Sequence, residues 1–85
     1  MAKWKAEVMV MLKEEVLDPQ GSAINKALEV MGHSNVADVR VGKYLELNLS
    51  GHDREKLCQQ VEDMCQRILS NPVIENYRYT LQEVE

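Results

Sequence analysis

Apolar residues occupy every second position near the start of the chain, and this alternation constrains the fold more than any other feature. Over residues 3–12 the apolar set is Trp4, Ala6, Val8, Val10 and Leu12. A two-residue period places such a set on one face of an extended strand. Residues 3–12 are therefore predicted to form a strand with one buried face. Met9 and Met11 make the opposite face partly apolar, and a covering partner would explain them.

A helix is predicted to begin at Asp18-Pro19. Aspartate can accept hydrogen bonds from the free amides of a first helical turn, and proline suits its first position. The apolar residues that follow at helical spacing are expected to be its buried stripe: Ala23, Ile24, Ala27, Leu28 and Met31. Gly32 is placed to end the helix, because glycine readily adopts the left-handed conformation found there.

The next alternating segment is interrupted at Gly42. Its apolar parity holds Val39, Val41, Leu45, Leu47 and Leu49, and Lys43 breaks that parity directly after the glycine. A bend or bulge within one strand would produce this pattern, and so would two tightly joined strands. We favour one long bent strand.

A second helix and a last strand complete the pattern. Apolar residues three and four apart predict an amphipathic helix over residues 53–69: Leu57, Val61, Met64, Ile68 and Leu69. Asn71-Pro72 should stop it. Residues 73–84 are then predicted to be a strand in which Tyr77, Tyr79 and Leu81 share a face.

The predicted order is strand, helix, strand, helix, strand, which indicates an α+β fold. We expect a single small domain over residues 1–85, with an antiparallel sheet and both helices packed on one of its faces. A chain of this length buries a modest core. Open sheet edges and an uncovered second face therefore favour a homo-oligomer.

Charge and motif content argue against several functions. The net charge is −4 and the basic residues are scattered, which disfavours a nucleic-acid partner. The longest apolar run, residues 8–12, is too short to cross a bilayer, so we expect a cytoplasmic protein without a membrane partner.

Cys58 and Cys65 lie about 10 Å apart along the predicted helix, too far for a disulfide. Neither a metal-ligand set nor a phosphate-binding loop is recognisable, and no catalytic, cofactor or metal residue is predicted.

Polar residues around Gly42 are the candidate contact site that the residues themselves suggest. The side chains of Arg40, Lys43 and Tyr44 could together contact a carboxylate or a phosphate of a partner. A solvated strand edge is the simpler interpretation, because alternating polar residues on a sheet face need no special explanation.

Three segments, in order, resemble the signatures of the PurS family. They are Val16-Leu17-Asp18-Pro19-Gln20-Gly21, then Asp38-Val39-Arg40-Val41-Gly42-Lys43-Tyr44-Leu45-Glu46-Leu47, and finally Asn71-Pro72-Val73-Ile74-Glu75. The resemblance covers essentially the whole chain. It departs from the family at residues 13–15, where Lys-Glu-Glu stands in place of a frequent Lys-Pro or Lys-Gly turn.

The resemblance implies a non-catalytic, structural subunit of phosphoribosylformylglycinamidine synthase, an ATP-dependent amidoligase complex of de novo purine biosynthesis. In that family PurS forms dimers and sometimes tetramers, bridges a PurL synthetase and a PurQ glutaminase, and assists ammonia transfer between them. The partner subunits use ATP, magnesium and glutamine, and this subunit itself would hold no cofactor. The residues carried over as partner-contact or shape-setting candidates are Asp18, Pro19, Gly21, Arg40, Gly42, Lys43 and Tyr44. The competing hypothesis is a small-molecule-binding regulatory module that acts as a dimer.

Overall fold

Strands and helices alternate in the computed structural model, which describes residues 2–84; Met1 and Glu85, the ends of the predicted domain, lie outside the described residues. The elements are β1 (Ala2–Leu12), α1 (Pro19–Val30), β2 (Gly42–Gly51), α2 (Arg54–Met64), a π-helical segment (Cys65–Leu69) and β3 (Glu75–Glu83). The predicted strand-helix-strand-helix-strand order is confirmed.

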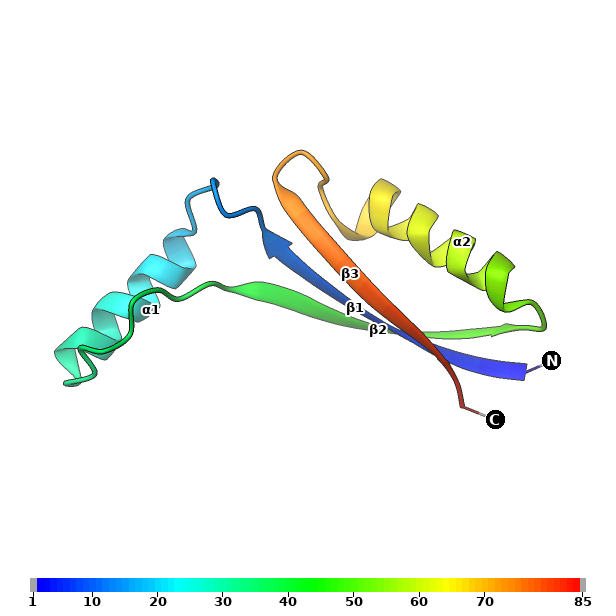
Figure 1. Ribbon diagram of the computed structural model, residues 1–85, viewed down its shortest axis with the longest axis horizontal. Helices are drawn as coiled ribbons and strands as arrows, with labels where there is room; N and C mark the ends of the chain where they lie inside the picture. The colour runs from blue at the N-terminus through cyan, green and yellow to red at the C-terminus, as the bar shows by residue number, and fades with distance from the viewer. Residues whose placement is uncertain (1, 85) are drawn as a thin grey trace.

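The first strand lies in the middle of the sheet. The strand order is β2-β1-β3 and both pairings are antiparallel. Trp4 stands opposite Leu49 on one side and Glu83 on the other. The burial of β1 agrees with the alternation that predicted it, because Ala6 and Val8 are completely buried on one face. Figure 1 shows the three strands side by side, with α2 beyond β3.

Helix α2 covers one face of the sheet and completes the core. Leu57 and Val61 from α2 and Cys65 from the π-helical segment are buried against β1. Tyrosines of β3 reach the helix, since the hydroxyl of Tyr77 donates to Glu62 Oε2 at 2.9 Å and that of Tyr79 to the carbonyl of Cys58 at 3.4 Å. The shared face predicted for the β3 tyrosines is therefore the core face.

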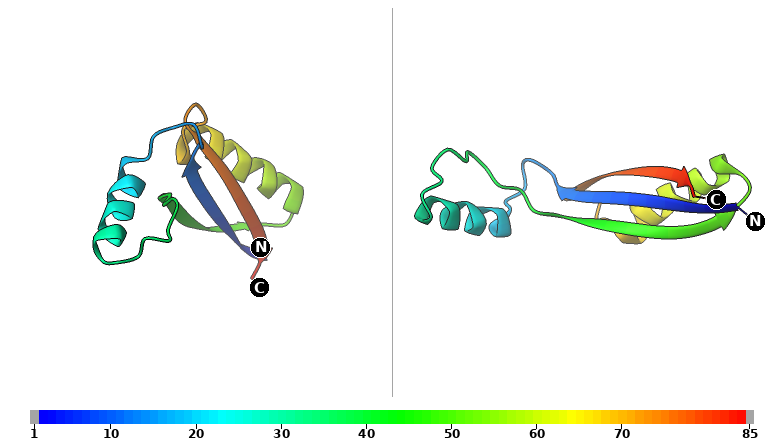
Figure 2. Two further views of the ribbon diagram at one scale, coloured as in Figure 1. Left: turned by 60° about the vertical axis from the view of Figure 1, so that its left-hand side comes forward. Right: turned by 90° about the horizontal axis from the view of Figure 1, so that it is seen from below.

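Helix α1 does not pack on the sheet, and the prediction that both helices cover one face is wrong for this chain. Figures 1 and 2 show α1 projecting beyond the end of the sheet. The expected stripe is open to solvent: Ile24 is 44% exposed and Met31 is 70% exposed. The radius of gyration is accordingly 16.8 Å, against about 12 Å for a compact domain of this length. Six residues separate the end of β1 from α1, and they lead the helix away from the sheet.

The second strand begins later than predicted. Residues 36–41 lie outside the ladder, and β2 starts at Gly42. The reason is the length of β1, whose Met11 is the partner of Gly42, so residues before Gly42 have little neighbouring strand left to pair with. One long bent strand is therefore incorrect. The inward parity of Leu45 and Leu47 is confirmed by their packing against the core.

The end of the second helix also differs from the sequence pattern. The last turn is π-helical, which adds a residue to the turn and shifts the faces of the residues that follow. Ile68 is consequently 77% exposed, whereas Leu69 packs against the core. The last strand starts at Glu75, not at residue 73, because residues 72–74 form the turn that leads into it.

Candidate functional site

The first part of the candidate site is the neck, the region between the sheet and α1 that contains Asp18, Pro19, Gly21, Arg40 and Gly42. Asp18 organises it. One carboxylate oxygen accepts a hydrogen bond from the amide of Gly21 at 2.9 Å, and the other accepts one from the amide of Val41 at 2.8 Å. Asp18 is 8% exposed. The hydrogen bond from Val41, followed by that from Gly21, lowers the pKa of the Asp18 carboxyl. Asp18, which was predicted to cap the helix, thus also hydrogen-bonds a segment that is distant in the sequence.

The neighbours of Asp18 in the sequence shape the same neck. Pro19 occupies the first turn of α1, as predicted, and is exposed. Gly21 is buried where α1 passes the segment before β2, because a Cβ there would lie 2.0 Å from the carbonyl oxygen of Val39. A side chain at position 21 would therefore push the helix away from residues 39–41.

Arg40 binds the loop that leaves β1. Its Nη2 donates to the carbonyls of Leu12 at 2.5 Å and Lys13 at 2.9 Å, and its Nη1 donates to that of Glu14 at 3.4 Å. The guanidinium is therefore occupied by the loop whose sequence departs from the family pattern. The structure does not combine Arg40 with Lys43 and Tyr44 into one anion-binding group.

Gly42 allows β2 to start beside the end of β1. A Cβ at this position would lie 2.2 Å from the sulfur of Met11 and 2.3 Å from the carbonyl oxygen of Val10. The missing side chain lets the Met11 thioether lie directly over the backbone of Gly42. The predicted shape-setting role of this glycine thus has a concrete steric basis.

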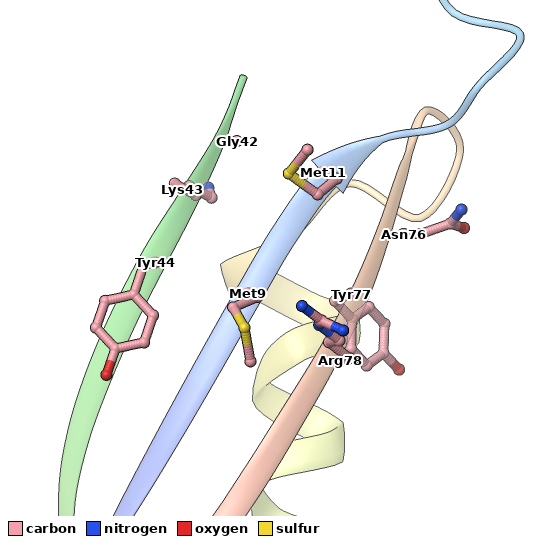
Figure 3. A pocket seen from close by; sticks show the side chains of 8 residues that line it. All are labelled: Met9, Met11, Gly42, Lys43, Tyr44, Asn76, Tyr77 and Arg78. Atoms are coloured by element: carbon pink, nitrogen blue, oxygen red, sulfur yellow. The ribbon is translucent and has the colours of Figure 1, made fainter. Parts of the chain in front are cut away.

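The second part of the site is the face of the sheet that α2 leaves open. Met9, Tyr44 and Arg78 stand next to one another across the three strands there, as Figure 3 shows. They surround a hollow of about 410 Å³. Its lining residues are Met9, Met11, Gly42, Lys43, Tyr44, Asn76, Tyr77 and Arg78.

Polar pairs border the hollow toward the middle of the sheet. The hydroxyl of Tyr44 donates to Glu7, and this hydrogen bond, followed by desolvation, raises the pKa of Tyr44 to about 12. Lys5 and Glu46 form an ion pair with 2.5 Å between Nζ and Oε2. That pairing raises the pKa of Lys5 and lowers that of Glu46. Two carboxylates of this face thus already have partners.

Sequence reasoning singled out Lys43 and Tyr44 but missed Arg78. Arg78 lies between two inward-facing tyrosines, so the alternation alone places it on the open face. Its position beside Met9 depends on the strand order and register, which join residues about 70 positions apart. An alternation pattern carries no information about that register.

The chain matches the family model described as PurS: Phosphoribosylformylglycinamidine (FGAM) synthase over residues 5–83. It is 52% identical over 81 residues to the phosphoribosylformylglycinamidine synthase subunit PurS of Bacillus subtilis, covering 95% of both chains. It is 38% identical to the subunit of the same name from Methanocaldococcus jannaschii, covering 96% of this chain and 99% of the relative.

Solved structures share the fold as well. The crystal structure of Bacillus subtilis PurS in its C2 form superposes with a TM-score of 0.85 at 51% identity, covering 94% of this chain and 99% of that one. A chain in the structure of PurLQS from Thermotoga maritima gives a TM-score of 0.85 at 30% identity, covering 99% of this chain and all of that chain. The similarity thus includes α1 and the neck as well as the sheet.

Proposed function

This chain belongs to the PurS family of phosphoribosylformylglycinamidine synthase subunits, and we propose that it bridges a PurL-like synthetase and a PurQ-like glutaminase. In this role it acts in purine biosynthesis and assists the transfer of ammonia from the glutaminase to the synthetase. The observation that carries the proposal is the match to a chain of the Thermotoga maritima PurLQS structure over 99% of the length of this protein.

The shape of the chain supports a bridging role. A helix held away from the sheet and a sheet face left open by α2 are surfaces that other chains can contact. The principal extents are 52 × 28 × 15 Å, so contacts at the two ends of the molecule can lie far apart. An elongated chain with separated contact surfaces is suited to joining two larger subunits.

The candidate residues divide by what they contact. Asp18, Pro19, Gly21, Arg40 and Gly42 belong to the neck, where they set the direction of α1, and this is the role that we assign to them. Tyr44 lines the hollow on the open face, and Lys43 borders it from the edge strand β2; both are assigned to partner contact.

Self-association is part of the proposal, as a homodimer or a homotetramer. Exposed apolar side chains on and beside α1 support it, since Ile24, Val30 and Met31 are 44%, 89% and 70% exposed. Apolar surface of this kind is usually covered by another chain.

Cofactor use and location complete the proposal. ATP, magnesium and glutamine are assigned to the catalytic partners, and this subunit contributes binding surface. Neither helix of the described residues is long and apolar enough to cross a membrane. We place the protein in the cytoplasm because its proposed partners carry out a biosynthetic reaction on small metabolites.

The test is synthesis of formylglycinamidine ribonucleotide by the purified synthetase and glutaminase, with and without this chain. Two nitrogen sources are compared, glutamine and an added ammonium salt. The expected result is that this chain raises the glutamine-driven rate and leaves the ammonium-driven rate nearly unchanged. If it changes neither rate, the bridging function is excluded, and a thermal-shift screen of small metabolites becomes the test of a regulatory module.

A further inference from the structure

One cation of the open face has no anionic partner within the described residues. The side chain of Arg78 makes no ion pair or side-chain hydrogen bond with any residue in the range 2–84. The nearby carboxylates of Glu7 and Glu46 are engaged by Tyr44 and Lys5 instead. The hollow therefore has an unbalanced positive charge in a chain whose net charge is −4.

The floor beside Arg78 is apolar and adaptable. It consists of the thioethers of Met9 and Met11 beside the bare backbone of Gly42. Met11 is 39% exposed. Methionine side chains are flexible and polarisable, and they are frequent at surfaces that accommodate a partner's apolar side chains. The hollow thus combines an apolar floor with a cationic rim.

The backbone favours a protein partner over a free phosphate. Phosphate sites commonly use several backbone amides that point at the ligand. Here β1 lies between two strands, so its amides along the floor are directed to β2 and β3. A thioether floor also gains little from a small, fully hydrated anion, whereas it gains from an apolar side chain.

Charge also argues against a second copy of this chain on the hollow. A two-fold contact places the same patch on both sides of the interface. It would bring Arg78 toward its own copy, while the carboxylates of this face are already paired. Like charges brought together at an interface oppose association.

We infer that the hollow bounded by Met9, Tyr44 and Arg78 receives a segment of a catalytic subunit that carries a carboxylate beside a large apolar side chain. The carboxylate pairs with Arg78, and the apolar side chain lies on Met9 and Met11. This inference rests on the proposed function, because it specifies one of the contacts through which the chain would bridge its partners.

The experiment measures binding of the full chain to each purified catalytic subunit by calorimetry at low and at moderate salt. The test variant is Arg78→Glu. Its matched control is Arg67→Glu in the π-helical segment, where Arg67 is exposed and pairs with Asp63. Circular dichroism checks folding, and light scattering measures the oligomeric state. Arg78→Gln serves as the second test variant if charge reversal disturbs the fold.

The expected result is that Arg78→Glu weakens binding to one catalytic subunit by about tenfold or more, with the oligomeric state unchanged. Salt should weaken wild-type binding more than that of the variant. The Arg67→Glu control should bind within about twofold of wild type, because exposed charge pairs contribute little.

Two outcomes overturn the inference. Binding of Arg78→Glu and Arg78→Gln equal to that of the control shows that the hollow is not a contact with either subunit. A change in self-association alone shows that a second copy occupies it. In both cases wild-type binding and glutamine-driven synthesis stand, so the proposed function survives. If the wild-type chain binds neither subunit, the proposed function and this inference fail together.

Discussion

The carboxylate of Asp18 accepts a 2.8 Å hydrogen bond from the backbone amide of Val41, 23 residues later in the chain. The same side chain caps the first turn of α1 through Gly21. One residue therefore joins the start of the helix to the segment that enters β2. The direction of α1 depends on a buried polar contact, because the helix makes few contacts with the sheet.

Replacing Asp18 with Asn should destabilise the chain at neutral pH. The amides of Gly21 and Val41 donate to different carboxylate oxygens. Asparagine replaces one of these oxygens with an NH2 donor, so one of the two amides loses its acceptor. The free energy of unfolding, measured by urea denaturation, should fall. Asp63→Asn is the control, because Asp63 is exposed and pairs only with Arg67 among the described residues, at 3.5 Å. Equal stability of the two variants would contradict the role given to the Asp18 carboxylate.

The stability of the wild-type chain should also depend on the protonation of Asp18. Its pKa in the folded chain is lowered, by the Val41 amide first, below the value of about 3.9 for an unfolded aspartate. The contribution is therefore fully present above about pH 4 and is lost as the pH falls through the folded pKa. Urea denaturation between pH 2 and pH 7 should show a smaller acid-induced loss in Asp18→Asn than in wild type. Identical pH profiles would argue against this linkage.

Gly42→Ala should destabilise the junction of β1 and β2. The added Cβ would lie 2.2 Å from the sulfur of Met11 and 2.3 Å from a backbone oxygen, and overpacking of this kind costs about 1–3 kcal/mol. Gly51→Ala is the control at the other end of β2, where the nearest atom is a Leu57 methyl at 3.2 Å. Thermal unfolding should rank the wild type first, Gly51→Ala next and Gly42→Ala last, and the reverse order for the variants would refute the steric argument.

Cys65→Ser should lower stability more than Cys58→Ser, and neither should change glutamine-driven synthesis while the chain stays folded. Cys65 is completely buried, and burial raises the pKa of its thiol. Burying a serine hydroxyl without a partner costs about 1–3 kcal/mol. A thiol reagent should modify Cys58 first, because Cys58 is partly exposed. Loss of synthesis in a folded cysteine variant would reveal a role for the thiols beyond packing.

Arg40→Lys should loosen the loop between β1 and α1 although it keeps the charge. A lysine ammonium cannot reproduce the fork of donors that reaches the carbonyls of Leu12, Lys13 and Glu14. Hydrogen exchange over residues 13–17 should become faster, including at the Val16 amide, which donates to Lys13. The same substitution at Arg67 should leave exchange in this loop unaltered. Unchanged exchange in Arg40→Lys would show that the loop holds its shape without the guanidinium.

The sequence predicted the elements that pack on one another within the chain. Alternation at Ala6 and Val8 indicated β1 because those side chains meet α2, and Leu57 and Val61 indicated α2 for the same reason. Local signals also identified the ends of α1, where Asp18 caps the start and Gly32 adopts a φ of 97°. These features depend on local geometry or on a core that the chain forms by itself.

Placement of α1 could not be predicted in this way. The spacing of Ile24 and Met31 is typical of a helix with a covered side, but it does not say which surface covers that side. Ile68 was misassigned because a π-helical turn shifts the faces of the residues within it. The pairing of Arg40 with carbonyls of a distant loop, and the position of Arg78 beside Met9, likewise depend on tertiary structure.

The central position of β1 affects how the chain folds during synthesis. Trp4 is made 79 residues before Glu83, its neighbour on one side of the sheet. During translation β1 can pair with β2, but its other edge and its apolar face wait for residues that emerge from the ribosome much later. Pairings between such distant segments slow folding. A nascent chain stalled before residue 75 would therefore expose an unpaired strand edge, and it should be a substrate for chaperones or proteases.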